Sequence, residues 1–168
     1  MAEDSFLIEY GATAKLDQKD KKILEALDKN ARLTIAEISK KTGIQRDSVL
    51  YRLNKMKRQK VIRFFHTVLN PSILGYPIYA FVNLTLHNLT QEREKIFLSF
   101  LKTHQSIIYV AKTTGKWDFM INVAARDLKH FDEIMTELRM RFSEIIKDYD
   151  TAPIIQEYKY DAMVGLIE

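Results

Sequence analysis

Residues 34–62 have the sequence TIAEISKKTGIQRDSVLYRLNKMKRQKVI, in which two short amphipathic segments flank a glycine. Thr34 is followed three residues later by Glu37, which is the spacing of a capping box at the start of a helix. Apolar residues then give this helix one buried side. The helix is predicted to end near Gly43, because glycine readily adopts the positive φ that a helix end requires.

A second helix is predicted from about Arg46 to Lys57. Val49, Leu53 and Met56 recur at i, i+4 and i+7 and therefore share an inward face. The outward face carries long cations and hydrogen-bonding groups, which suit a groove lined by base edges and phosphates; these residues are Arg46, Ser48, Tyr51, Arg52 and Lys55. The pattern is that of a helix-turn-helix. Ordinary helical hairpins also have a glycine between two amphipathic helices, so the pattern alone leaves both interpretations open.

The distribution of charge favours the helix-turn-helix. Residues 15–66 carry fifteen Lys or Arg against six Asp or Glu, a net charge of +9, whereas residues 67–168 carry eleven against thirteen, a net charge of −2. A basic segment of this kind predicts a polyanionic partner whose affinity falls as the salt concentration rises. Double-stranded DNA is therefore the expected partner.

Composition excludes several other classes of site. The chain of 168 residues has no cysteine, so disulfides and thiolate metal sites are excluded. The histidines lie far apart in sequence, and neither a phosphate-binding glycine loop nor a catalytic motif is present; they are His66, His87, His104 and His130. No apolar run reaches the length of a membrane span, and no signal peptide begins the chain. We expect a soluble, cytoplasmic protein that has no metal, no cofactor and no catalytic site and does not associate with a membrane.

The N-terminal part of the chain divides into three segments. Residues 1–14 form an acidic leader with an apolar patch, either a frayed terminus or an arm that docks on a partner subunit. Residues 15–62 form the helix-turn-helix domain, whose first helix begins after Asp17, a favourable N-cap, and ends near Asn30. Residues 63–77 form an extended linker that contains Pro71, Gly75 and Pro77.

Residues 78–168 alternate between strand and helix patterns. Strands are predicted at 78–87, 106–114, 117–125 and 154–160, and helices at 91–104 and after Asp127. In the first of these helices the inward residues are predicted to be Ile96, Phe97, Phe100 and Leu101. The order βαββαβ is that of a ferredoxin-like domain. The predicted fold class is therefore α+β, with a helix-turn-helix (winged-helix-like) domain followed by a ferredoxin-like domain.

One face of the predicted sheet is covered by the two helices, and the other face is too apolar to face water. An exposed apolar patch of this size usually marks an interface; the residues are Tyr79, Phe81, Tyr109, Met120, Tyr158 and Tyr160. We expect a homodimer in which two such sheets pack together. Two-fold symmetry would present two recognition helices to a palindromic DNA site.

Four motifs occur in order along the chain: LDQKDKKIL at residues 16–24, a recognition helix and exit running from Gly43 to Ile62, NPSILG at residues 70–75, and TGKWD at residues 114–118. In this order and at these spacings, residues 16–160 resemble the Lrp/AsnC (feast/famine) family of transcription regulators. It implies a winged or three-helix DNA-binding domain and a βαββαβ domain that dimerises. Dimers in this family often assemble further into tetramers or octamers.

The resemblance also implies an effector site. In many members a small molecule, frequently an amino acid, binds near the Gly-x-x-Asp turn, which here is Gly115, Lys116, Trp117 and Asp118. Glycine lets backbone N–H groups approach a ligand carboxylate, and Asp118 is suited to an ammonium group. The alternative is structural: Gly115 forms a hairpin turn and Asp118 accepts a hydrogen bond within the domain.

For DNA contact we predict Arg46, Ser48, Tyr51 and Arg52 at base edges or adjacent phosphates, and Lys55, Lys57, Arg58 and Lys60 on the backbone. Arg52 is alternatively a packing arginine that orients the helix. The chain departs from the family at both ends of the recognition helix. Gln45 replaces the usual serine, which weakens the cap, and Lys60 replaces the usual glycine, which requires an unusual backbone or a different turn.

Two further functions remain open at this point. The sequence also resembles siroheme decarboxylases, which are enzymes with the same two-domain arrangement. His66 and the basic surface would suit their substrate, a carboxylated tetrapyrrole. Alternatively, the protein is a scaffold or effector-binding protein whose helix-turn-helix no longer binds DNA, although its charge of +9 argues against this.

Overall fold

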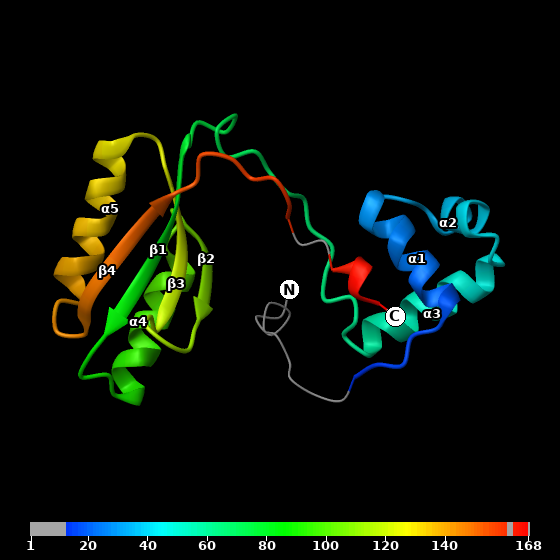
Figure 1. Ribbon diagram of the computed structural model, residues 1–168, viewed down its shortest axis with the longest axis horizontal. Coiled ribbons are helices and arrows are strands. Elements are labelled where there is room, and N and C mark those ends of the chain that lie inside the picture. Colours follow the sequence, from blue (N-terminus) through cyan, green and yellow to red (C-terminus); the bar gives the residue numbers. More distant parts are fainter. Residues whose placement is uncertain (1–12, 161–162, 168) are drawn as a thin grey trace. The chain divides into compact units, whose positions relative to one another are not determined.

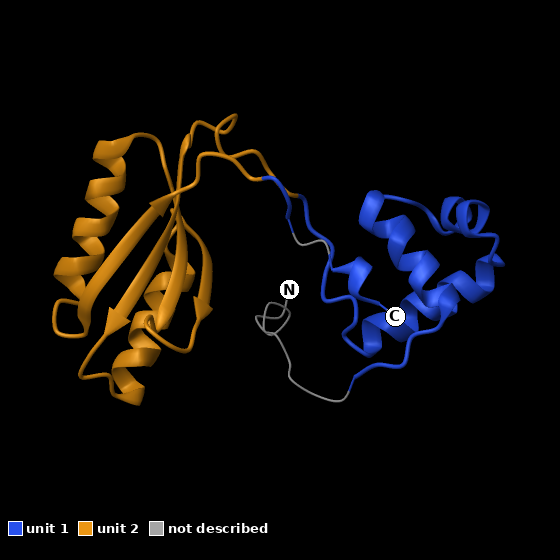
Figure 2. Ribbon diagram, viewed as in Figure 1, with its two compact units in different colours: residues 1–67, 158–168 blue, residues 68–157 orange. Residues whose placement is uncertain are grey.

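The computed structural model describes residues 13–160 and 163–167. The apolar patch predicted in the leader, at residues 6–10, lies outside these residues. The described chain forms two compact units, shown in Figure 2. The first contains residues 1–67 together with 158–168, and the second contains residues 68–157. The division differs from the predicted boundaries, because the last residues of the chain belong to the first unit.

The first unit, called the DNA-binding unit below, contains three helices: α1 (Gln18–Lys29), α2 (Ile35–Thr42) and α3 (Arg46–Arg58), labelled in Figure 1. A short 3₁₀ helix, η2 (Val164–Leu166), joins them from the C-terminus. Among the described residues of this unit there is no strand, so the predicted domain takes its three-helix form. Its core contains the predicted inward residues of α3 and the apolar side of α1.

Both predicted N-caps are present. The Asp17 carboxylate accepts from the backbone N–H of Asp20 at 3.0 Å, and the Asp20 carboxylate accepts in return from the Asp17 N–H at 3.2 Å. Thr34 and Glu37 make the same reciprocal pair at the start of α2. Gly43 ends α2 at φ +71°, in the left-handed region as predicted. These caps fix where α1 and α2 begin and so set the turn before α3.

The second unit, called the sensor unit below, is a four-stranded antiparallel sheet of order β2-β3-β1-β4. Its elements are β1 (Ile78–Leu86), α4 (Gln91–Thr103), β2 (Ile107–Lys112), β3 (Phe119–Ala125), α5 (Leu128–Arg141) and β4 (Ile146–Pro153). Both helices pack on one face of the sheet (Figure 1), where Val82, Ile121 and Phe97 are among the fully buried side chains. The fold is α+β and ferredoxin-like, as predicted.

The position of the last strand was predicted wrongly. β4 spans Ile146–Pro153, and residues 154–160 are outside the sheet. The strand was missed because it is an edge strand with Lys147, Asp148 and Asp150 in its middle, and a charged edge hides the apolar alternation that marks a strand. Tyr158 and Tyr160 therefore do not lie on the sheet; Tyr158 is 94% exposed.

The inward face of α4 was also partly wrong. Phe97 and Leu101 are buried as predicted and Phe100 is half-buried, but Ile96 is 55% exposed. Ile96 lies about 100° around the helix from Phe97, because successive residues of an α-helix are separated by that angle. Among the described residues, no helix is both long and apolar enough to cross a membrane.

Candidate functional site

The exposed side of α3 carries the residues available to a groove. Of the eight predicted DNA contacts, five are exposed: Arg46, Tyr51, Lys57, Arg58 and Lys60. Ser48 is half-buried. Three residues of α3 that were not predicted to contact DNA are also exposed: Asp47, Leu50, which is 48% exposed, and Asn54. Spacings of three and four residues place Leu50, Tyr51, Asn54 and Arg58 along one stripe, and this spacing was the signal that could have identified them.

Arg52 turns away from this stripe toward α1. Its guanidinium Nη1 lies 2.7 Å from carboxylate oxygens of both Asp17 and Asp20. Asp20 is completely buried, so it needs a cation to compensate the loss of water. Lys55 approaches the same carboxylate, with 4.0 Å between Nζ and Oδ2 of Asp20. Arg52 thus joins α3 to α1, the packing role that the sequence left open.

The ion pairs change the acidity of the partners. The backbone N–H of Asp20, and next to it the Arg52 guanidinium, lower the pKa of the Asp17 carboxyl below its usual value. The hydrogen bonds that the Arg52 guanidinium donates to the carboxylates of Asp17 and Asp20 raise the pKa of Arg52. Both groups are therefore charged throughout the neutral range, and the connection between α1 and α3 is maintained there.

The two ends of α3 differ from those of α1 and α2. Gln45, the N-cap, makes no side-chain hydrogen bond to the helix, as expected for glutamine at this position. At the other end Lys60 has φ +56°, so this lysine does adopt the unusual backbone. The Val61 N–H then bonds the carbonyl of Met56 at 2.9 Å, which closes the helix end.

The turn from Gly115 to Asp118 lies between β2 and β3. Gly115 has φ +111°, which favours glycine. Asp118 Oδ2 accepts from the backbone N–H of Leu86 at 2.7 Å, and the Asp118 N–H donates to the Leu84 carbonyl at 2.9 Å. Asp118 therefore ties the turn to β1, which agrees with the structural alternative for this residue.

Lys116 and Trp117 converge on one carboxylate of β4. Trp117 Nε1 donates to Asp150 Oδ2 at 3.1 Å, and Lys116 Nζ lies 3.6 Å from the same oxygen. The Lys116 ammonium also lies 5.0 Å from the centre of the Trp117 ring. The four predicted effector residues thus form one turn, and the Lys116 ammonium and the Trp117 ring are held against the edge strand β4.

The face of the sheet opposite the helices carries four of the six predicted interface residues: Tyr79, Phe81, Tyr109 and Met120. Asn122 lies among them, paired in register with Phe81 on one side and Tyr109 on the other. It is almost completely buried, yet its Oδ1 has no hydrogen-bond partner among the described residues.

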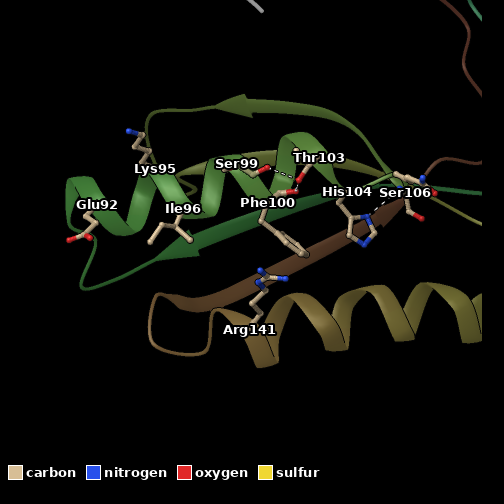
Figure 3. A pocket seen from close by; sticks show the side chains of 10 residues that line it. Glu92, Lys95, Ile96, Ser99, Phe100, Thr103, His104, Ser106 and Arg141 are labelled. Carbon is tan, nitrogen blue, oxygen red and sulfur yellow. Dashed lines mark hydrogen bonds between the residues drawn. The ribbon is translucent and has the colours of Figure 1, made fainter.

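A hollow of about 910 Å³ lies on the opposite, helical side of the sensor unit. Figure 3 shows Phe100 of α4 and Arg141 of α5 pointing toward one another, and the guanidinium carbon lies 4.9 Å from the ring centre. His104 Nε2 lies 3.5 Å from a Glu137 carboxylate oxygen and connects the same two helices. The hollow includes none of the residues of the Gly115 turn. In the described part of the chain no cluster of metal-ligating side chains occurs.

Comparison with known protein families is decisive for the identity of both units. Residues 16–63 match a family model for winged helix-turn-helix DNA-binding domains, and residues 79–164 match the model for the Lrp/AsnC ligand-binding domain. The chain belongs to the Lrp/AsnC family of transcriptional regulators. The resemblance seen in its sequence is thereby confirmed, and the protein is a DNA-binding transcriptional regulator.

Curated relatives of this Lrp/AsnC regulator have the same function. The HTH-type transcriptional regulator FL11 of Pyrococcus furiosus is 31% identical over 120 residues, which cover 71% of this chain and 78% of that protein. The leucine-responsive regulatory protein of Klebsiella pneumoniae is 26% identical over 144 residues, covering 86% and 87% respectively. These relatives are transcriptional regulators, and the comparisons give no support to the tetrapyrrole decarboxylase alternative.

Solved structures agree with the fold. AsnC of Escherichia coli superimposes with a TM-score of 0.76 at 24% identity, covering 90% of this chain and 99% of that one. A transcriptional regulator of Neisseria meningitidis, solved as a complex with L-methionine, superimposes with a TM-score of 0.78 at 20% identity and covers 88% and 95%.

Proposed function

We propose that this Lrp/AsnC regulator recognises a specific DNA site through the exposed stripe of α3 formed by Leu50, Tyr51, Asn54 and Arg58. The proposal is supported above all by Arg52, whose two carboxylate partners remove it from the groove-facing side and leave this stripe as the available surface. The chemistry of the stripe suits base edges. An asparagine side chain bonds adenine with two hydrogen bonds, and an apolar side chain contacts the methyl group of thymine.

The experiment is a gel-shift titration on the DNA upstream of the protein's own gene. We expect Asn54→Ala to lose about 1–3 kcal/mol of binding free energy and to relax the preference for one base pair. Arg58→Ala should instead lower the slope of log affinity against log salt by about one unit, as loss of one phosphate contact does. Lys22→Ala, an exposed cation on α1, is the matched control and should change neither. Equal affinities for the Asn54 and Lys22 variants would contradict base recognition by this stripe.

We further propose that the protein is a homodimer joined through the open face of the sheet. This face carries Phe81 and Tyr109, and Tyr109 is 49% exposed, so a second copy packed on the face would cover its apolar surface. Phe81→Glu should convert the dimer to monomers in light scattering. Ile96→Glu, on the helical side, is the control and should remain dimeric; a dimeric Phe81 variant would contradict the proposed interface.

An amino acid is the proposed effector, with the turn from Gly115 to Asp118 as its site. Support comes from the matched ligand-binding domain and from the L-methionine complex of the Neisseria regulator. A ligand carboxylate would compete with Asp150 for the Lys116 ammonium. Trp117 is the single tryptophan of the chain, so its fluorescence reports directly on this turn. One amino acid should produce a saturable change that Lys116→Ala weakens and Lys112→Ala retains. If no amino acid changes the emission at millimolar concentrations, the turn is not the site.

A further inference from the structure

The last described residues of the chain pack against the DNA-binding unit. Val164 and Ile167 are half-buried against its core cluster, to which Ile23, Leu24 and Leu27 of α1 contribute. Leu166, between them, is 73% exposed. Residues 163–167, called the tail below, therefore have one apolar side against the unit and one side in water.

A polar contact holds the tail at its end. The Lys21 ammonium, on α1, donates a hydrogen bond to the backbone carbonyl of Ile167. Lys21 is half-buried, so part of its aliphatic chain is covered by protein while its ammonium group makes this hydrogen bond. The 3₁₀ helix of the tail packs against α1, so its apolar and polar contacts reach the same helix. Asp20 of α1 and its N-cap Asp17 also hold Arg52 of α3.

The tail is separated from the rest of the DNA-binding unit by the whole sensor unit in the sequence. The chain passes from the DNA-binding unit to the sensor unit after Thr67 and returns after Glu157. The two passages connect to neighbouring strands, because Ala80 of β1 pairs with Pro153 of β4 and the Ile154 N–H donates to the Tyr79 carbonyl at 2.7 Å. The DNA-binding unit is consequently attached to the sensor unit through two segments of chain.

We propose that the tail is an integral part of the DNA-binding unit and acts as a second tether. In this role it completes the apolar cover of α1, and it connects the end of β4 to the helix that positions α3. The chemical partner of this α1 surface is the chain's own C-terminal segment, with Val164 and Ile167 as its anchors. The inference concerns stability and attachment, so it stands or falls independently of the operator sequence and of any effector.

Amide hydrogen exchange of the full chain tests the proposal. In the variant Val164→Asp/Ile167→Asp we expect the amides of α1 to exchange at least tenfold faster, because charged residues cannot occupy the apolar contact. The amides of β3 should be unaffected. Leu166→Asp is the matched control and should leave α1 unchanged. Unaltered exchange of α1 in the double variant would overturn the proposal.

A milder experiment avoids introducing charge, in case the double variant fails to fold. The chain contains no cysteine, so single variants Ile167→Cys and Leu166→Cys give unambiguous thiol labelling. We expect a maleimide to modify the cysteine at 167 at least fivefold more slowly than the one at 166. Lys21→Ala, combined with each, should raise the rate at 167 only. Equal labelling rates at the two positions would show that the tail is not held on α1, and the proposal would fail.

Discussion

Lys60 shows how a single residue can depart from its family without loss of the fold. Its φ of +56° is a conformation that costs a non-glycine residue roughly 1–2 kcal/mol. The helix end is nevertheless closed by the bond from the Val61 N–H to the Met56 carbonyl. The backbone strain at Lys60 is therefore compatible with a closed end of α3, beside the cations Lys57 and Arg58.

Replacing this residue by glycine should stabilise the protein. Glycine removes the steric cost but gains freedom in the unfolded chain, so we expect Lys60→Gly to raise the free energy of unfolding by about 0.5–1 kcal/mol. Thermal denaturation measures the change. Lys60→Ala is the control, because it removes the charge and the side-chain contacts while keeping the strained backbone. A glycine variant no more stable than the alanine variant would show that the backbone of Lys60 is not strained.

At the scale of the element, the sequence predicted those features of a helix or strand that depend only on residues close together in the chain. Asp17 and Thr34 were identified as caps because a cap requires only a side chain and the next three residues. The ion-pair partners of Arg52 could not be predicted from the sequence, because Asp17 and Asp20 are more than thirty positions away from it. β4 was missed for a related reason: an edge strand is defined by its neighbour, here β1, and its own charged residues conceal it.

The candidate sites divide in the same way. The outward residues of α3 followed from helical periodicity, which also would have supplied Leu50 and Asn54. The open face of the sheet was predicted correctly for β1, β2 and β3, whose alternation is strong, and wrongly for Tyr158 and Tyr160, which depended on a misplaced strand. The folding of residues 163–167 onto α1 had no sequence signal, because five residues are too few to show a period.

The N-caps predict how the DNA-binding unit responds to acid. Hydrogen bonds lower the pKa of Asp17, through the Asp20 N–H and then Arg52, and that of Glu37, through Thr34. A carboxyl whose pKa is lowered by folding stabilises the protein above its unfolded pKa of about 4, and this contribution is lost as the pH falls through the lower, folded value. Stability of the DNA-binding unit should therefore decline below about pH 4.

The double variant Asp17→Asn/Glu37→Gln provides the comparison. We expect it to be less stable than the parent at pH 7 and to show a smaller loss between pH 5 and pH 2, because two of the titrating groups are absent. Helix content followed by circular dichroism during thermal melts gives both values. Parallel pH profiles for the parent and the variant would contradict a role for these two carboxylates.

At the scale of the whole molecule, two units of different charge are joined twice. The basic segment, with its net charge of +9, is confined to the unit that bears α3, and the sensor unit contributes the sheet. Attachment through two segments restricts rotation of one unit against the other more than a single linker does. A dimer with restricted units should bind paired DNA half-sites at defined separations.

Lengthening the connections tests this restriction. We expect six Gly/Ser residues inserted after Ser72 alone, or after Gln156 alone, to leave the preference for half-site spacing largely intact, because the other segment still restrains the unit. Insertions at both positions should allow binding when the half-sites are moved apart by about 5 base pairs, half a turn of DNA. Gel shifts on a series of spaced sites measure this. Loss of the spacing preference after the first insertion alone would mean that the tail does not restrain the unit.

The tail also has a consequence for how the protein is made. The α1–α3 segment is synthesised before the sensor unit, but residues 163–167, which also pack on the core of the DNA-binding unit, are synthesised after it. The sensor unit, whose residues 68–157 are contiguous, can fold while the polypeptide is still attached. The DNA-binding unit is then completed only after the sensor unit, so a chain whose translation stops before residue 163 would carry a folded sensor unit beside a DNA-binding unit without the apolar cover of the tail.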